Sequence, residues 1–280
     1  MLCDVTASIV IYRNDVHVLK RSIDSVLSIG FKLRLYVIDN SGTDGARDVC
    51  NDNRIEYVLN DSNVGFAAGH NIAIKHTIQE KSKYHLVLNP DVYFEKGGLN
   101  KLYDFMEKNP DVGLAMPRIL YPDGSLQYLC KLLPTPMDLI RRRFFPSSKY
   151  SDRKNSLYEL RFTGYNRTMD VPYLSGCFMF IRTEALSRAG LFDERFFMYL
   201  EDADLSRRIH KYYRTVYYPE VFVFHEYRKG SYKNWKLLIY HVRSAIRYFN
   251  KWGYLFDKER QDINRNILKA LIDETGGKSR

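Results

Sequence analysis

The chain has 280 residues, a formal net charge of +10 at pH 7 and 45% apolar residues, enough for one large domain or two small ones. No uncharged apolar run approaches the ~20 residues that a membrane-spanning helix needs, and residues 1–12 lack a basic start, so we expect no cleaved signal peptide. The four cysteines are widely separated without a Cys-x-x-Cys pair, which favours a reducing cytoplasm over a zinc site or a disulfide framework.

The first 115 residues alternate short apolar runs with helical patterns. The runs predict strands at residues 7–12, 33–38, 55–59 and 84–88, and the apolar spacing predicts helices at residues 18–27 and 71–79. This alternation is typical of a mostly parallel, Rossmann-like sheet with helices on both faces. Such sheets bind ligands outside the carboxyl ends of their strands.

The chain changes character after residue 116. Prolines interrupt the sequence, and we expect residues 134–170 to be irregular. Residues 171–181 predict a strand interrupted by Ser175-Gly176, and a helix starts near Thr183. A further helix is predicted at residues 202–212 and a last strand at residues 216–224.

Residues 235–252 predict the clearest amphipathic helix. One interpretation is that its apolar stripe packs against the rest of the protein. The other is that its basic face docks on an anionic membrane, because residues 228–251 contain seven Lys or Arg and no Asp or Glu. The two are compatible. The stripe consists of Trp235, Leu238, Ile239, Val242, Ile246 and Phe249, and the basic residues outside it are Lys236, Arg243, Arg247 and Lys251.

Two segments of the first half carry candidate ligand-binding groups. Asp39 follows the second strand, where a carboxylate can accept a hydrogen bond from a base, although Asp is also a common turn residue. Residues 63–71 form a glycine-containing loop that enters a helix, and a helix N-terminus favours phosphate. This loop is not Gly-x-Gly-x-x-Gly, which counts against a dinucleotide dehydrogenase.

Asp91 and His225 are candidate metal ligands. Asp91 follows the fourth predicted strand, and a carboxylate there suits a hard divalent cation that also binds substrate phosphates. His225 ends the last predicted strand, where an imidazole can complete the coordination of Mn²⁺ or a similar ion, although a lone histidine is more often structural.

The segment Glu201-Asp202-Ala203-Asp204 places three carboxylates at a helix start. Such charge is favourable near a helix N-terminus, and Asp204 can form an i,i+4 bridge with Arg208. The preceding aromatic residues also provide an apolar wall that raises the pKa of a carboxylate and prepares it to act as a base.

These features together resemble the inverting glycosyltransferases of family 2, which have the GT-A fold, and within them the bacterial rhamnosyltransferase-type branch. The resemblance covers about residues 6–232. It rests on residues 8–12, 37–41, 63–71, 88–91, 174–176, 190–197, 201–208 and 225–231, in this order and spacing.

The resemblance implies a role for each candidate residue. Tyr12 and Asp39 contact the ribose and base of the donor, and Asp202 is the general base. Asp91 is the remaining carboxylate of an Asp-x-Asp metal motif whose first position is Asn89, and His225 is a further ligand of Mn²⁺ or Mg²⁺. Asn40 and Gly65 complete the donor side, and Ser175, Gly176 and Glu201 lie on the acceptor side.

The resemblance also implies the reaction. We expect transfer of a sugar, L-rhamnose from dTDP-rhamnose in the first instance, to a saccharide or polyprenyl-linked acceptor of a bacterial surface polysaccharide such as O-antigen or capsule. UDP- or GDP-sugar donors are the alternative. A nucleotidyltransferase shares the sheet and the metal but does not explain Glu201-Asp202 with His225. The alternative from a different class is a nucleic-acid-binding module that uses the positive charge, which no helix-turn-helix, RRM or zinc pattern supports.

The resemblance divides the chain into a catalytic domain and a C-terminal extension. Residues 1–232 form the GT-A domain, with the nucleotide-sugar half at residues 1–115 and the acceptor half at residues 116–232. Residues 233–280 form the amphipathic helical extension. We expect a cytoplasmic protein that is peripheral on the inner face of the membrane.

Overall fold

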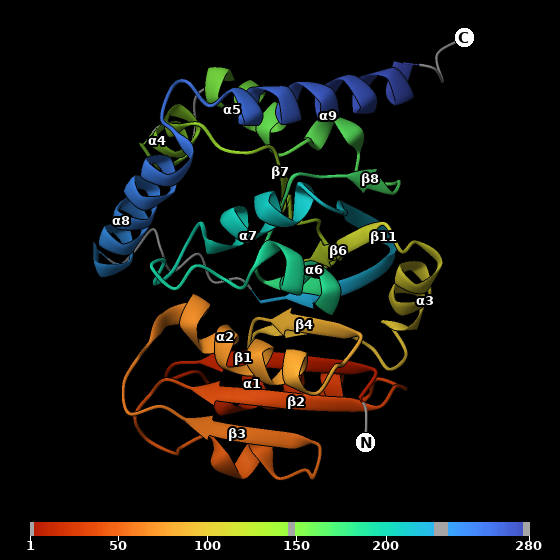
Figure 1. Cartoon of the computed structure of the whole chain (residues 1–280), viewed down its shortest axis with the longest axis vertical. Helices are drawn as coiled ribbons and strands as arrows, with labels where there is room; N and C mark the ends of the chain where they lie inside the picture. Colours follow the sequence, from red (N-terminus) through yellow and green to blue (C-terminus); the bar gives the residue numbers. More distant parts are fainter. Residues whose placement is uncertain (1–2, 145–148, 227–234, 277–280) are drawn as a thin grey trace.

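A mixed sheet runs through the molecule (Figure 1). The structure is a computed structural model that describes residues 3–144, 149–226 and 235–276. In this part of the chain the main sheet has nine strands in the order β3-β2-β1-β4-β10-β6-β11-β5, with β8 also paired to β11, and β7 pairs with β9 in a small second sheet. The strands are β1 (Val5–Ile11), β2 (Leu33–Asp39), β3 (Ile55–Leu59), β4 (Tyr84–Leu88), β5 (Val92–Tyr93), β6 (Val112–Leu120), β7 (Cys130–Lys131), β8 (Met169–Asp170), β9 (Tyr173–Leu174), β10 (Phe178–Arg182) and β11 (Arg214–His225).

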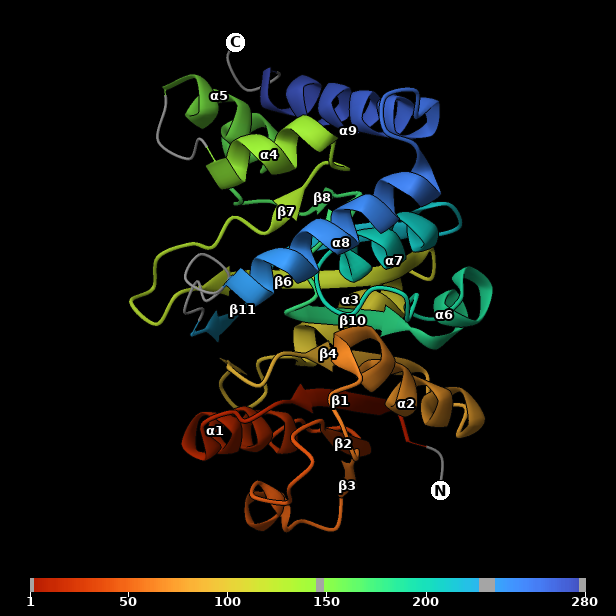
Figure 2. The same cartoon turned by 90° about the vertical axis from the view of Figure 1, so that its left-hand side faces the viewer.

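The first half of the sheet is parallel, as its alternating sequence predicts. Strands β1 to β4 all pair in the same direction. The flanking helices α1 (Val16–Leu27) and α2 (Gly65–Gln79) lie on opposite faces of this half (Figure 2). Because α2 begins at Gly65, most of the glycine-containing segment predicted as a loop is the first turns of a helix.

Buried polar contacts hold α2 on the sheet. The Ser8 hydroxyl lies 2.7 Å from His70 Nδ1 and 2.8 Å from His85 Nε2. The Thr6 and Thr77 hydroxyls are 2.7 Å apart. Burial lowers the pKa of His85 to about 3, so the ring is neutral and its nitrogens pair with hydroxyl groups.

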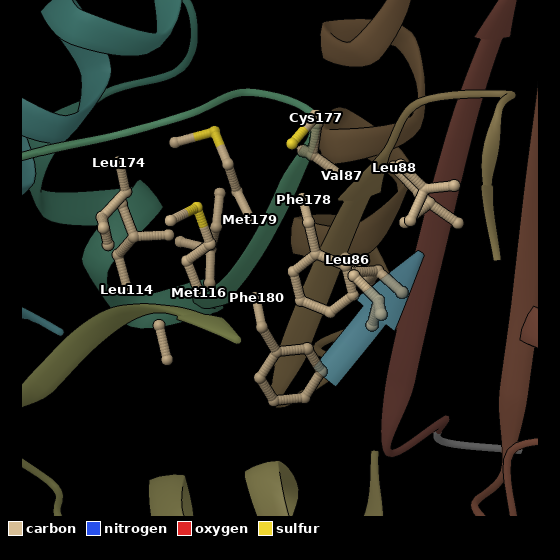
Figure 3. Close-up of a cluster of buried hydrophobic side chains, with 14 of the residues drawn as sticks. Leu86, Val87, Leu88, Leu114, Met116, Leu174, Cys177, Phe178, Met179 and Phe180 are labelled. Carbon is tan, nitrogen blue, oxygen red and sulfur yellow. The ribbon is translucent and has the colours of Figure 1, made fainter. Parts of the chain in front are cut away.

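The second half of the sheet is mixed. Strand β10 pairs antiparallel with β4 and with β6, whereas β11 runs parallel to β6. Figure 3 shows Phe178 and Phe180 of β10 beside Leu86 of β4, in the apolar core that joins the halves. The interruption predicted at Ser175-Gly176 is confirmed, since these residues separate β9 from β10.

The prediction that residues 134–170 are irregular is wrong. This insertion contains α4 (Pro136–Phe144), α5 (Lys149–Tyr158) and the 3₁₀ turn η2 (Arg161–Thr163). Pro136 occupies the first position of α4, where its missing N–H costs no hydrogen bond, so the residue begins a helix rather than breaking one.

Helices cover the remaining surfaces. They are α3 (Asn100–Lys108), α6 (Thr183–Ala189), α7 (Glu201–His210), α8 (Trp235–Trp252) and α9 (Lys258–Gly276), with the short 3₁₀ turn η1 (Arg47–Cys50) after β2. The bounds predicted for α8 are confirmed, and α9 lies within the predicted C-terminal helical extension, although its own bounds were not predicted. Among the described residues, no helix has both the length and the apolarity needed to cross a bilayer.

The predicted packing face of α8 needs correction. Ser244, Tyr248 and Phe249 are the residues that α8 buries. Four members of the predicted stripe are instead exposed, because the apolar arc of the helix is wider than the surface that covers it. These are Trp235 (68% exposed), Ile239 (38%), Val242 (46%) and Ile246 (48%).

A buried ion pair ties α7 to α9. The Arg207 guanidinium donates hydrogen bonds of 2.6 and 2.7 Å to the two carboxylate oxygens of Asp257 and one of 2.7 Å to Glu259. Both Arg207 and Asp257 are almost fully buried, and the guanidinium lies 4.0 Å from the Trp252 ring. Removing one partner of such a pair leaves an uncompensated buried charge.

Replacing Arg207 therefore tests the attachment of the C-terminal helices. We expect Arg207→Met to lower the free energy of unfolding by about 3 kcal/mol or more, measured by urea denaturation. Lys20→Met, which breaks the exposed Lys20–Asp24 pair, is the matched control and should cost no more than about 1 kcal/mol. Equal effects of the two substitutions would contradict this assignment.

Candidate active site

The carboxyl ends of β1 and β2 meet at one edge of the sheet, because Ile11 pairs with Asp39. Asp39 is buried, accepts the Ser41 N–H at 2.8 Å and accepts the Tyr57 hydroxyl at 2.5 Å. Burial and the neighbouring Asp39 charge raise the pKa of Tyr57, so its hydroxyl stays a donor. Both Asp39 oxygens are thus held in place, while Tyr12, next after β1, is exposed.

Asn40 connects this strand end to the start of α2. Its side-chain amide donates to the Asn63 side-chain oxygen and the Gly65 carbonyl, both at 3.3 Å, and its oxygen accepts from Asn60 at 2.8 Å. Gly65 has φ +87°, and a Cβ there would lie 2.5 Å from the Phe197 carbonyl oxygen. The structure therefore explains this glycine by a contact within the protein, and its role toward a phosphate stays a prediction.

Asp91 and His225 are brought together from distant parts of the sequence. Their strands pair, with His225 opposite Val92, and His225 Nε2 lies 3.3 Å from Asp91 Oδ1. The side-chain oxygen of Gln127 lies 3.0 Å from His225 Nδ1, and its amide donates to the His225 carbonyl at 2.8 Å. Gln127 thus assigns the donor hydrogen to Nδ1 and turns Nε2 toward the carboxylate.

This contact fits a bound cation. Burial opposes a charge on His225, but Cys177 and Asp91 outweigh it and raise the pKa of His225 to about 10. The contact between Nε2 and the carboxylate therefore needs a positive charge between its atoms, whether a proton or a metal ion. Among the described residues no group of three His, Cys, Asp or Glu side chains is arranged to hold a metal ion by itself, so a metal ion would take its other ligands from phosphates or water.

Asn89 connects this pair to the turn at Ser175 and Gly176. The Asn89 N–H donates to the Cys177 carbonyl at 2.9 Å. Gly176, which precedes Cys177, donates its N–H to Asp202 Oδ2 at 2.9 Å. The Tyr173 hydroxyl lies 3.2 Å from Asp202 Oδ1. A Cβ on Gly176 would lie 3.1 Å from the Asp202 Cβ, so the turn needs a small residue for this close approach.

The carboxylates of the acidic segment occupy different environments. Asp204 is fully buried and forms the predicted bridge with Arg208 at 2.8 Å, together with Lys251 at 2.7 Å. Glu201 is also buried, and its Oε2 has no hydrogen-bond partner among the described residues. Burial, reinforced by the charge of Asp202, raises the pKa of Glu201 well above its usual value. Burial therefore favours the neutral form of Glu201 more than that of an exposed glutamate.

Backbone strain marks the entry to this segment. Tyr199 and Leu200 have φ of +74° and +66°, in the left-handed region that non-glycine residues rarely adopt. Two such residues in succession directly before Glu201 cost free energy that the surrounding structure must offset. Strain of this kind is typical of functional sites.

Three residues that orient the site were not predicted. Tyr57 holds Asp39, Gln127 holds His225, and Tyr173 donates to Asp202. Their residue types are common and no local motif marks them. Only the pairing of the strands brings them to these carboxylates and to the imidazole.

Comparison with known structures identifies the architecture as the GT-A fold of glycosyltransferases. The mannosyltransferase PcManGT from Pyrobaculum calidifontis, in complex with GDP-Man and Mn²⁺, matches with a TM-score of 0.58 and 16% identity over 98% of this chain and 76% of its own. GalNAc-T7 with UDP, GalNAc and Mn²⁺ matches with a TM-score of 0.59 and 16% identity over 81% of this chain and 44% of its own. The model of glycosyl transferase family 2 matches residues 8–190, and the chain belongs to this family.

Curated relatives include rhamnosyltransferases. The N-acetylglucosaminyl-diphospho-decaprenol L-rhamnosyltransferase of Mycobacterium tuberculosis is 32% identical over 145 residues, which are 50% of this chain and 46% of the relative. The low-salt glycan biosynthesis hexosyltransferase Agl10 of Haloferax volcanii is 26% identical over 74% of this chain and 62% of its own. Rhamnosyltransferase WbbL of Escherichia coli K12 is 24% identical over 71% and 75%. The chain thus spans about half the length of the mycobacterial relative.

The raised pKa of Glu201 predicts a pH-dependent stability. The folded chain holds the Glu201 proton at pH values where the unfolded chain releases it, so the free energy of unfolding falls as pH rises above the unfolded pKa. Glu201→Gln keeps a neutral group and removes this dependence. We compare the free energies of unfolding of Glu201→Gln and of the original chain. Between about pH 4 and about pH 8, we expect this difference to shift by at least about 1 kcal/mol in favour of Glu201→Gln.

Urea denaturation at a series of pH values measures this difference. Glu184→Gln, at an exposed position of α6, is the matched control and should follow the original chain throughout. Parallel stability curves for Glu201→Gln and the original chain would show that Glu201 is ionised in the folded state.

Proposed function

We propose that this chain is an inverting glycosyltransferase that moves a sugar from a nucleoside diphosphate to a hydroxyl group of a saccharide acceptor. The observation that carries the proposal is the position of Asp202. The Gly176 N–H and the Tyr173 hydroxyl hold its carboxylate, and the residue after Gly176, Cys177, accepts the Asn89 N–H. Family membership and the GT-A fold support this reading of the geometry.

In the proposed reaction Asp202 accepts the proton of the acceptor hydroxyl as the oxygen attacks the anomeric carbon. One carboxylate is sufficient, because a single displacement inverts that carbon and needs no covalent nucleophile. The raised pKa of Glu201 disfavours the charged form of that neighbour, and we assign the base to Asp202. Tyr173 and the Gly176 N–H orient the Asp202 carboxylate.

On the donor side we propose that Tyr12, Asp39 and Asn40 contact the nucleoside. Asp91 and His225 are the residues that would hold Mn²⁺ or Mg²⁺, with Gln127 orienting the imidazole. Such an ion offsets the negative charge of a diphosphate leaving group. Asn89 places an amide where the family's metal motif has its first carboxylate, so Asp91 supplies the negative ligand.

We propose dTDP-rhamnose as the donor and a lipid-linked saccharide of bacterial surface polysaccharide synthesis, such as O-antigen, as the acceptor. The rhamnosyltransferases among the relatives support the sugar, and the decaprenol in the name of the mycobacterial relative supports the lipid. The alternative is a UDP- or GDP-sugar, since the two solved structures hold UDP and GDP-Man.

Asp202→Asn tests the base. We expect sugar transfer to fall by about a hundredfold or more, the size typical of removing a general base, while binding of dTDP measured by calorimetry stays unchanged. Asp104→Asn, at an exposed position of α3, is the matched control and should retain transfer. Near-normal turnover by Asp202→Asn would remove Asp202 from this role.

A donor panel tests the sugar. Purified protein with Mn²⁺ should turn over dTDP-rhamnose faster than UDP- and GDP-sugars, measured by release of the nucleoside diphosphate. Turnover with another donor alone would replace rhamnose and leave the transferase assignment intact.

We also propose that the protein acts at the cytoplasmic face of the membrane, docked through α8. The exposed residues Trp235, Ile239, Val242 and Ile246 recur at helical spacing along one stripe. The exposed cations Lys236, Arg243 and Arg247 lie on one side of that stripe, about a quarter to a third of a turn from it. This combination of apolar and basic faces matches an anionic lipid surface. Residues 228, 229 and 233 of the predicted basic run lie outside the described residues.

Co-sedimentation with anionic vesicles tests the docking. We expect binding at low salt that weakens at high salt, and a loss of about tenfold for Ile239→Glu because a buried charge opposes insertion. Ile272→Glu places the same charge on α9 at a similarly exposed position and should bind like the original chain. Equal binding by all three proteins would contradict docking through α8.

A further inference from the structure

A half-buried lysine lies beside the proposed base and, among the described residues, has no carboxylate in direct contact. Strand β7 pairs with β9 so that Lys131 is opposite Tyr173, and the Lys131 ammonium lies 4.8 Å from the centre of the Tyr173 ring. The hydroxyl of that ring reaches Asp202. Within the described part of the chain, the Lys131 ammonium makes no hydrogen bond or ion pair.

A second cation of this region comes from α4. Arg142 of α4 stacks its guanidinium 5.1 Å from the Tyr158 ring and pairs with Glu159. The Leu132 N–H donates to the Tyr158 carbonyl at 3.0 Å, which holds the end of α5 against β7. Because Arg142 stacks on Tyr158, this bond also brings Arg142 close to the strand that carries Lys131. Burial and the charge of Arg142 lower the pKa of Lys131, while the charges of Asp202 and Glu159 act in the opposite direction.

The nearby carboxylates are already engaged. Glu159 offers one oxygen to Arg142 and the other to Arg161. Asp202 accepts hydrogen bonds from Gly176, Tyr173 and the Ala203 N–H. Three cations, Lys131, Arg142 and Arg161, thus share two carboxylates in this region. An added anion would offset the excess positive charge.

We propose that Lys131 and Arg142 form a binding site for a substrate phosphate beside Asp202. An ammonium and a guanidinium are the two side chains that bind phosphate most strongly. If the proposed function holds, the phosphate belongs to the acceptor, because Asp202 receives the acceptor hydroxyl and a phosphate on the same sugar lies about one ring away. The insertion with α4 and the β7–β9 pair then selects phosphorylated acceptors over neutral glycosides.

Binding of inorganic pyrophosphate, measured by calorimetry without divalent cations, tests the site without any turnover. We expect Lys131→Gln and Arg142→Gln to weaken binding about tenfold or more each, the effect of losing one charge-assisted hydrogen bond. Lys131→Arg should restore binding. Lys101→Gln, at an exposed position of α3, controls for the general basic charge and should bind like the original chain.

Kinetics then identify the source of the phosphate. For a short-lipid N-acetylglucosaminyl diphosphate, we expect Lys131→Gln to raise KM about tenfold with little change in kcat. KM for octyl N-acetylglucosaminide should stay constant, and so should calorimetric binding of dTDP. Weakened dTDP binding with an unchanged acceptor KM would assign the same phosphate site to the donor.

The proposal is overturned if pyrophosphate binds equally to the original chain and to Lys131→Gln, or if the Lys101→Gln control loses as much affinity. Equal losses of activity on charged and neutral acceptors would show that Lys131 only supports the fold. If no acceptor reacts with any protein, the proposed function fails, but the pyrophosphate measurement still decides whether the site exists.

Discussion

Strand β10 begins where β4 ends, because the two strands pair antiparallel with Phe178 opposite Leu88. The residues just before β10 therefore lie at the same edge of the sheet as the carboxyl ends of the parallel strands. This edge brings Gly176 and Cys177 next to Asn89, and with them the helix that carries Asp202. Without the reversal at β10, the acidic segment would lie at the opposite end of the sheet from Asp39 and Asp91.

Neighbouring carboxyl groups at this edge of the sheet have different surroundings. Glu201 is buried and its pKa is raised, whereas Asp204 is buried with two cations. Asp202 lies between them in sequence and receives neutral donors from Gly176 and Tyr173. A short acidic segment thus places its carboxyl groups in three different environments, which depend on partners that other elements provide.

The sequence was sufficient to predict the strands of the parallel half, the strand-end positions of Asp39, Asp91 and His225, and the Asp204–Arg208 bridge, because each follows from local pattern. It was not sufficient for Tyr57, Gln127 and Tyr173, whose contacts depend on which strands pair. Pro136 was misread because a proline that breaks one helix also begins another. On α8, the apolar arc is wider than the covered surface, and periodicity alone does not tell which part of such an arc is buried.

The attachment of α9 to α7 has a consequence for how this chain can vary. Arg207 and Asp202 both lie on α7, and the Arg207 side chain binds Asp257, the residue just before α9. The short turn between α8 and α9, with Gly253 at φ +96°, therefore sets the position of a helix that carries the proposed base. The C-terminal helices are not a separable appendage, and an exchange of this region between family members would transfer the alignment of α7, which carries Asp202, along with it.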